Sequence, residues 1–328
     1  MTPRYDWDRA VTNFCQYLPR SVRHWVVALQ GPAHGGIARA VLPRLDSTEV
    51  VILADLPPPS IRNLVRTYVE RPDVGFLEFT VNIGQFWDAD HRGAMTELAR
   101  WPRDRVKRCF DVWDANFGIL FSEDPVDVAQ RCQALRGMLT PHQLLEYNDD
   151  YNLTSALNLN CEGSAWTAYT GFEEFDYILP SGEVSCLPQS VDGQLEVEGW
   201  IVGTIPFGLK YGHIRRGDLL LGFDGGVVST VTGRHTELCT DLDNAFARLP
   251  GLRSVGELGI GQSTAVARAA MLHEMGCHWH ERHFGIHLGL GVELPETADP
   301  KRGATAHHLD IVLARGSLTA GKTLLAKW

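Results

Sequence analysis

Residues 25–54 read WVVALQGPAHGGIARAVLPRLDSTEVVILA, and this stretch places a segment of helical spacing between two apolar runs. The first run is Trp25–Leu29, a glycine loop follows at residues 31–36, and the second run is Val50–Ala54. Apolar residues recur at helical spacing over 37–45, so the order is strand, helix, strand. This order is typical of a βαβ unit and predicts an open, parallel α/β sheet of Rossmann-like type.

The alternation of helices and strands continues to about residue 147. We expect helices at 60–70, 104–116 and 125–138 and a strand at 75–81, which together predict an α/β domain over residues 1–147. From Asn152 onward the chain is rich in Gly, Thr and Val with turn signals. Strands are expected at 153–160, 198–205, 218–223 and 227–232 and a helix at 264–274, which predicts a β-rich α+β domain over residues 148–328.

The composition excludes several classes of protein. The chain has 328 residues, of which 44% are hydrophobic, and 30 basic against 40 acidic residues give a net charge of −10. This negative charge makes nucleic acid an unfavourable partner. No apolar stretch is long enough to span a membrane, and the N-terminus lacks an apolar signal segment, so we expect a cytoplasmic protein that does not bind membranes.

The glycine loop at 31–36 is similar to a dinucleotide-binding loop, with Asp55 at the end of the next strand. A dinucleotide fingerprint requires G-x-G-x-x-G, whereas this loop reads GPAHGG. The third position is Ala33 where the second glycine belongs. We interpret the loop as a structural turn.

Histidines are concentrated near the C-terminus, where seven of the 13 lie between residues 273 and 328. The segment His280-Glu281-Arg282-His283 resembles a zinc-protease helix, but its two histidines are three apart rather than the four that H-E-x-x-H requires. Taken alone, this segment and its neighbours Cys277 and His278 are interpreted as a surface histidine cluster.

Four short motifs are better candidates for a metal site. They are LPSGEV (179–184), VGELGIG (255–261), GIHLGLG (285–291) and HLDIV (308–312). Their ionisable residues stand mostly among glycines and aliphatic residues, where a lone charge costs several kcal/mol unless it has a partner. A shared cation would be such a partner, and the glycines would let the backbone approach it. The candidate metal ligands are Glu183, Glu257, His287, His308 and Asp310.

The donor set of these motifs limits the choice of metal. His308 and Asp310 are two residues apart and would project from the same face of a strand. Three carboxylates and two imidazoles suit zinc, manganese, cobalt or iron, as one divalent ion or as two.

The four motifs, in this order, resemble those of the aminopeptidase T/aminopeptidase S metallopeptidases and of the related iron-dependent, ring-cleaving dihydroxypyridine dioxygenases. The resemblance covers about residues 150–315. In the peptidases the corresponding residues ligate two neighbouring metal ions, which implies that Glu183, Glu257, His287, His308 and Asp310 are ligands here. It also implies a homodimer or larger assembly.

The sequence departs from both branches of this family. The dioxygenases hold iron with a histidine where this chain has Glu257. The peptidases have a tyrosine where this chain has Leu294, and their E-K dipeptide before the third-motif histidine has no clear counterpart, the nearest carboxylate being Glu281.

Three functions follow as expectations from the resemblance. The first is an aminopeptidase-like hydrolase, in which zinc, cobalt or manganese ions bridged by Glu257 activate a water that attacks a peptide N-terminus, with Glu281 as a proton shuttle. The second is a non-hydrolytic peptide-binding or tailoring protein of a peptide natural-product pathway. The third is an oxygenase with one Fe(II) on His308, Asp310 and either Glu257 or His287. The expected partner is accordingly a peptide or a small-molecule substrate.

Overall fold

The computed structural model describes residues 6–52, 58–80, 101–140, 142–149, 152–173, 175–291 and 307–328. The chain forms two compact units. Unit 1 comprises Met1–Ala129, Tyr169–Gly182 and Thr264–Ala269, and unit 2 comprises Gln130–Ala168, Glu183–Ser263 and Ala270–Trp328. The domain boundary between residues 147 and 148 stays a prediction. None of the helices in the described part of the chain is long and apolar enough to cross a lipid bilayer.

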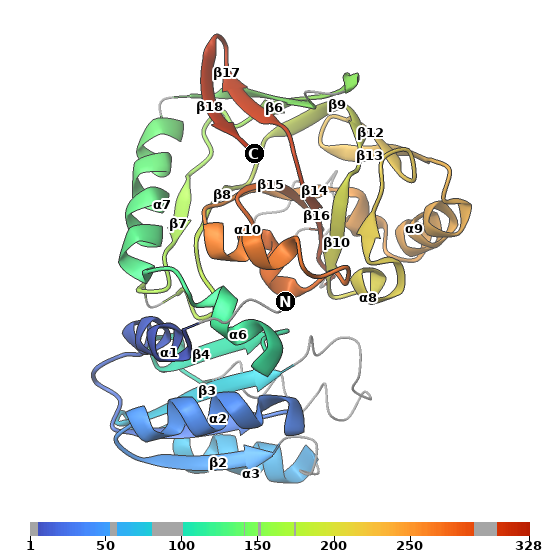
Figure 1. Cartoon of the computed structure of the whole chain (residues 1–328). Coiled ribbons are helices and arrows are strands. Elements are labelled where there is room, and N and C mark those ends of the chain that lie inside the picture. The colour runs from blue at the N-terminus through green and yellow to red at the C-terminus, as the bar shows by residue number, and fades with distance from the viewer. Residues whose placement is uncertain are drawn as a thin grey trace. The chain divides into compact units, whose positions relative to one another are not determined.

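Unit 1 contains a four-stranded sheet in the order β2-β1-β3-β4 (Figure 1). The strands are β1 (His24–Leu29), β2 (Thr48–Ile52), β3 (Val74–Thr80) and β4 (Val106–Phe110). All three pairings are parallel, as the predicted βαβ unit requires. The helices among the described residues of this part of the sequence are α1 (Trp7–Gln16), α2 (Gly35–Val41), α3 (Pro58–Tyr68), α6 (Asp114–Leu120) and α7 (Pro125–Leu139), with 3₁₀ turns η1 (Pro32–His34), η2 (Leu42–Arg44) and η4 (Arg103–Arg105).

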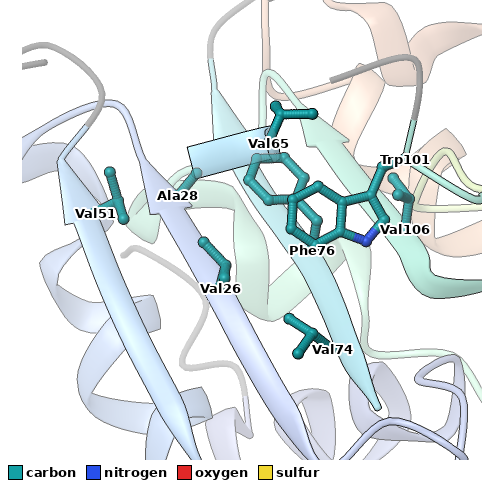
Figure 2. Close-up of a cluster of buried hydrophobic side chains, with 8 residues drawn as sticks. All are labelled: Val26, Ala28, Val51, Val65, Val74, Phe76, Trp101 and Val106. Atoms are coloured by element: carbon teal, nitrogen blue, oxygen red, sulfur yellow. The ribbon is translucent and has the colours of Figure 1, made fainter. Parts of the chain in front are cut away.

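One face of this sheet carries a hydrophobic cluster, shown in Figure 2. Val26, Phe76 and Val106 stand opposite one another on adjacent strands and are buried, and the Trp101 ring lies 5.3 Å from that of Phe76. Val65 of α3 joins the same cluster. The first apolar run therefore becomes the buried inner strand β1, because both faces of the sheet are covered there, whereas the described residues of the second run lie in the edge strand β2 and leave Val50 exposed.

The helix predicted at 104–116 is wrong. Residues 106–110 form β4, and α6 begins only at Asp114. Val106, Phe110 and Trp113 have helical spacing in the sequence by coincidence. The backbone of Arg108 instead donates to the carbonyl of Tyr177 and accepts from the amide of Leu179, so strand pairing outweighs the local pattern.

The glycine loop forms an internal turn. The backbone amides of Gly36 and Ile37 donate to the carboxylate of Asp114 at 2.6 and 2.8 Å. A β-carbon at Gly36 would lie 2.7 Å from that carboxylate, so the glycine is needed for this contact. A carboxylate of the chain itself thus holds these two amides. Asp55, the acidic residue considered with the loop, lies outside the described residues.

Two seven-stranded sheets make up the rest of the strand structure. The first, called here the site sheet, has the order β11-β10-β16-β15-β14-β8-β7, and its pairings from β11 to β8 are antiparallel. Its strands are β7 (Thr167–Tyr169), β8 (Glu183–Cys186), β10 (Gly199–Gly203), β11 (His213–Ile214), β14 (Val255–Gly261), β15 (Gly285–Leu290) and β16 (Leu309–Leu313).

The second sheet is antiparallel throughout and has the order β13-β12-β9-β6-β5-β17-β18. Its strands are β5 (Leu144–Asp149), β6 (Asn152–Asn160), β9 (Ser190–Glu196), β12 (Leu220–Asp224), β13 (Val227–Thr232), β17 (Ser317–Ala320) and β18 (Thr323–Lys327). The remaining helices are α8 (Phe207–Tyr211), α9 (Thr236–Arg248) and α10 (Thr264–Ala270), with η5 (Pro250–Arg253) and η6 (His278–Arg282).

The predictions for this part of the chain are largely confirmed. The strands expected at 153–160, 198–205, 218–223 and 227–232 correspond to β6, β10, β12 and β13. The helix expected at 264–274 ends earlier, at Ala270. Beyond it the amide of Gly276 donates to the carbonyl of Gly208, a contact so close that no side chain fits between the two backbones.

Candidate metal centre

The centre of the site sheet has one polar and one apolar face. Directly opposed residues of antiparallel strands project to the same face, and the register pairs Glu183 with Gly261, His287 with Gly259, and both Glu257 and Asp310 with Gly289. These four ionisable residues therefore share a face. The alternate positions are fully buried aliphatic side chains, which anchor the opposite face: Val184, Leu258, Ile260, Ile286, Leu288, Leu290, Leu309 and Ile311.

The five predicted ligands lie in two overlapping groups. Glu183, Glu257 and His287, here called the inner triad, each place one ligand atom within 4.8 Å of the others. Glu257, His308 and Asp310, the outer triad, do the same. Glu257 belongs to both triads, so all five side chains gather around one carboxylate.

Individual distances show how close these groups are. His287 Nε2 lies 3.5 Å from Glu183 Oε1. His308 Nε2 lies 2.8 Å from Asp310 Oδ1 and 3.6 Å from Glu257 Oε2. In both triads an imidazole nitrogen faces carboxylate oxygens at distances that a small cation can bridge.

Two glycines provide the space for the imidazoles. A β-carbon at Gly259 would lie 2.1 Å from His287 Cε1, and one at Gly289 would lie 2.6 Å from His308 Cε1. Real β-carbons do not approach other atoms so closely. The glycines of the GELGIG and GIHLGLG motifs are therefore required for the side-chain arrangement of the site.

The triads differ in their exposure to solvent. The side chains of Glu257 and His308 are 26% and 18% exposed, whereas those of Glu183 and His287 are 3% and 1% exposed. Asp310 is buried, and its Oδ2 has no hydrogen-bond partner among the described residues. A buried carboxylate oxygen without a partner is costly, and a cation on the outer triad would supply one.

The electrostatics of the metal-free chain fit a cation site. Burial and the charge of Glu183 raise the pKa of Glu257. Burial lowers the pKa of His287, but the hydrogen bond and charge of Glu183 outweigh it and raise that pKa to about 9. Burial also lowers the pKa of His308, but the charge and hydrogen bond of Asp310 outweigh burial and raise that pKa well above its ordinary value. The neighbouring carboxylates thus favour the protonated form of both imidazoles, and a bound divalent cation would replace these protons.

The 3₁₀ turn η6 adds a cation that the sequence analysis missed. Arg282 Nη1 lies 2.5 Å from Glu183 Oε2 and 2.6 Å from Glu281 Oε2, and all three side chains are buried. The other oxygen of Glu281 lies 3.5 Å from His278 Nδ1. Burial and the charge of Asp310 raise the pKa of Glu281. Arg282 stands next to Glu281 in the HERH segment, but its contact with the distant Glu183 is tertiary and has no signal in the local sequence.

The interpretation of the HERH segment as a surface cluster is wrong. His280 and His283 are buried, and so is Cys277. The His280 ring stacks on Trp279 at a centroid distance of 4.2 Å and lies 4.4 Å from the ring of Trp200. Burial lowers the pKa of His280 to about 3 and that of His283 to about 4, so these two imidazoles are neutral near pH 7, as their packing against aromatic rings requires.

Leu294, which stands where the peptidases have a tyrosine, lies outside the described residues. The five candidate ligands, in contrast, are all described and all lie in unit 2.

Comparisons with known proteins identify a similar fold. No family model matches the sequence, and no curated protein matches it. The solved structure of 2,5-dihydroxypyridine dioxygenase from Pseudomonas putida KT2440 matches 98% of this chain and 94% of its own, with a TM-score of 0.64 and 15% sequence identity. This similarity shows a shared fold. The fold neighbour is an oxygenase, so the expectation of an aminopeptidase or other hydrolase is wrong, and the resemblance to the dioxygenase branch is the one that the fold supports.

Proposed function

We propose that this chain is an Fe(II)-dependent, ring-cleaving dioxygenase that acts on a hydroxylated aromatic or heteroaromatic ring. The outer triad, Glu257, His308 and Asp310, carries this proposal, because its ligand atoms converge at the solvent-accessible side of the site. The fold shared with a 2,5-dihydroxypyridine dioxygenase supports the reaction class.

The residues present fit a divalent metal ion. Asp310 Oδ2 is a buried oxygen that could ligate a metal and has no hydrogen-bond partner among the described residues. Gly259 and Gly289 leave room for the imidazoles. One imidazole and two carboxylates form a variant of the two-histidine-one-carboxylate set of non-haem iron oxygenases, with Glu257 replacing one histidine. A bound ferrous ion would bind and activate oxygen and a deprotonated ring hydroxyl.

The protein side chains would orient the substrate and move its proton. Glu281 has a raised pKa and lies in the buried cluster beside Arg282, so it remains our candidate to accept the proton of a ring hydroxyl. Arg282 would hold the Glu281 carboxylate in place. The buried Glu183 and His287 would exclude water from the inner side of the site.

Oxygen consumption tests this function. The protein is loaded with Fe(II) without oxygen and then mixed with oxygenated buffer containing 2,5-dihydroxypyridine or a panel of catechols and hydroxypyridines. We expect oxygen uptake, and with ¹⁸O₂ both labelled atoms enter a ring-opened product. Asp310→Asn and His308→Ala should abolish uptake. His307→Ala, which removes a neighbouring imidazole outside both triads, is the matched control and should retain it. Iron-loaded protein that consumes no oxygen with any of these rings would contradict the proposal.

A further inference from the structure

We propose that the guanidinium of Arg282 takes the place of a second metal ion, so that the chain binds one divalent cation on the outer triad and none on the inner triad. This inference rests on the metal centre of the proposed function. It assigns Arg282 a positioning role that determines how many ions the site accepts.

The contacts of Glu183 support this assignment. One of its oxygens, Oε2, lies 2.5 Å from Arg282 Nη1, and the other, Oε1, faces His287 Nε2 at 3.5 Å. Both carboxylate oxygens therefore already face a nitrogen of the chain. A cation on the inner triad would have to share Glu183 with a guanidinium that is always charged.

The position of Arg282 is fixed by the backbone of η6. The amide of Ser263 donates to the Arg282 carbonyl at 3.1 Å. A β-carbon at Gly261 would lie 2.0 Å from the His283 carbonyl oxygen and 2.6 Å from the Arg282 carbonyl carbon, so η6 packs directly on β14. The Arg282 side chain is 8% exposed and has little freedom to leave the site when a second ion approaches.

No arginine or lysine of the described residues forms an ion pair with the outer triad. The ion-pair contacts of Asp310 and Glu257 are with His308, which a metal ion can deprotonate and use as a ligand. Asp310 Oδ2 has no partner in the described part of the chain, and Glu257 and His308 are reached by solvent. Two solvent-exposed side chains and a buried carboxylate oxygen without a hydrogen-bond partner among the described residues thus occur together in the outer triad, whereas the inner triad reaches solvent only through the shared Glu257.

Metal counting on isosteric variants tests the inference. The purified protein is dialysed against Co(II) or Mn(II) and its metal content is measured by mass spectrometry. We expect one ion per chain in the wild type. Asp310→Asn, which alters only the outer triad, should lose it, and Glu183→Gln, which alters only the inner triad, should retain it.

Variants of Arg282 test its own role. Arg282→Met keeps the length of the side chain but removes its charge, and we expect the metal content to rise from one ion to two. Arg282→Lys keeps the charge and should stay at one ion. Circular dichroism establishes that each variant is folded.

Several results would overturn the inference. They are two ions in the wild type, one ion that Glu183→Gln loses and Asp310→Asn keeps, or a folded Arg282→Met variant that still binds one ion. If Arg282→Met does not fold, anomalous scattering from a Co(II)-soaked wild-type crystal decides. A single peak at the outer triad supports the inference, and a peak between Glu183 and His287 overturns it.

The outcome is separate from that of the proposed function, because metal counting uses neither oxygen nor an aromatic substrate. A protein with one ion and no oxygenase activity would contradict only the proposed function. An active oxygenase with two ions would contradict only the role of Arg282.

Discussion

The imidazole of His287 lies where the side chain of residue 259 would begin. An added β-carbon at Gly259 would be 2.1 Å from His287 Cε1 and 2.2 Å from His287 Nε2, and 2.8 Å from Glu183 Oε1. The two residues are opposed on β14 and β15, so neither backbone can move away without breaking the sheet pairing. The glycine is thus a structural condition for the inner part of the metal centre.

Gly259→Ala should therefore damage both the fold and the site. We expect the free energy of unfolding to fall by about 1–3 kcal/mol, as in other overpacked cores, with reduced metal affinity because His287 is displaced towards the other ligands. Gly137→Ala is the matched control. Gly137 lies in α7 with open space around its α-carbon, and alanine should stabilise that helix by roughly 0.5–1 kcal/mol. Urea unfolding and metal titration of both variants measure the effects; equal stability of the two would show that the contact is unimportant.

Metal binding should stabilise the folded chain. With Mn(II) or Fe(II) at about 100 times its dissociation constant, we expect about 2.7 kcal/mol of added stability and a matching rise in the melting temperature. Glu257→Gln should remove most of this rise, because Glu257 belongs to both triads. Glu162→Gln, which changes an exposed carboxylate, should leave it unchanged. A melting temperature that does not respond to any divalent ion would argue against the metal centre.

Acid should destabilise the protein through its buried neutral histidines. The folded pKa of His280 is lowered to about 3 and that of His283 to about 4, whereas both titrate near 6.5 in the unfolded chain. As the pH falls below 6.5, protons bind the unfolded chain first, so the stability present at neutral pH is lost progressively down to the folded pKa. Each histidine lowers the free energy of unfolding by about 1.4 kcal/mol for each pH unit in this range.

His280→Phe keeps an aromatic ring beside Trp279 and Trp200 but cannot take up a proton. Its free energy of unfolding, measured in urea with a chelator present, should depend less steeply on pH between 6 and 4 than that of the wild type, by about 1.4 kcal/mol per unit. The offset at pH 7 reports the packing change together with the loss of the hydrogen bond that the Cys277 amide donates to His280 Nδ1. Parallel curves for the two proteins would exclude His280 as a source of acid sensitivity.

Unit 1 contains a buried lysine whose loss should be costly. Lys107 Nζ donates to the carbonyls of Gly171 and Asp176 at 2.7 and 2.8 Å, and burial lowers its pKa. Lys107→Met removes both hydrogen bonds and should reduce the free energy of unfolding by about 1–3 kcal/mol, because two carbonyls lose a donor. Lys322→Met, at an exposed turn, should change stability by less than about 0.5 kcal/mol. Chemical unfolding of both variants is the measurement, and a neutral effect of Lys107→Met would show that water replaces the ammonium.

The sequence pointed to the candidate metal ligands because a charged residue among glycines and aliphatic residues needs a partner. A glutamate in GELGIG or a histidine in GIHLGLG alternates with aliphatic residues, so the same strand that buries Leu258 or Leu288 must turn its charged residue to the opposite face. Alternation also predicted β6, and composition with turn signals predicted β12 and β13. These features depend only on neighbours along the chain.

Other features depend on tertiary contacts that no local pattern indicates. Arg282 enters the site because Gly261 lets η6 lie directly on β14, and neither residue reveals this contact in the sequence. His280 and His283 are buried by Trp279 and Trp200, one of which is far away along the chain. Residues 104–116 have helical spacing, and yet residues 106–110 within them pair with β3. No local pattern fixes the reaction class either, because the same five candidate ligands suit hydrolysis and oxygenation.

Four of the five candidate ligands stand on four adjacent strands of the site sheet, β8, β14, β15 and β16, and the fifth, His308, comes immediately before β16. A bound metal ion would then link these strands on the polar face of the sheet, as packing of the aliphatic side chains links them on the apolar face. We expect their backbone amides to exchange hydrogen with solvent as one cooperative group, more slowly with metal than without it. The exchange rates of these amides would in that case report whether the metal is bound, even at residues that do not contact the ion.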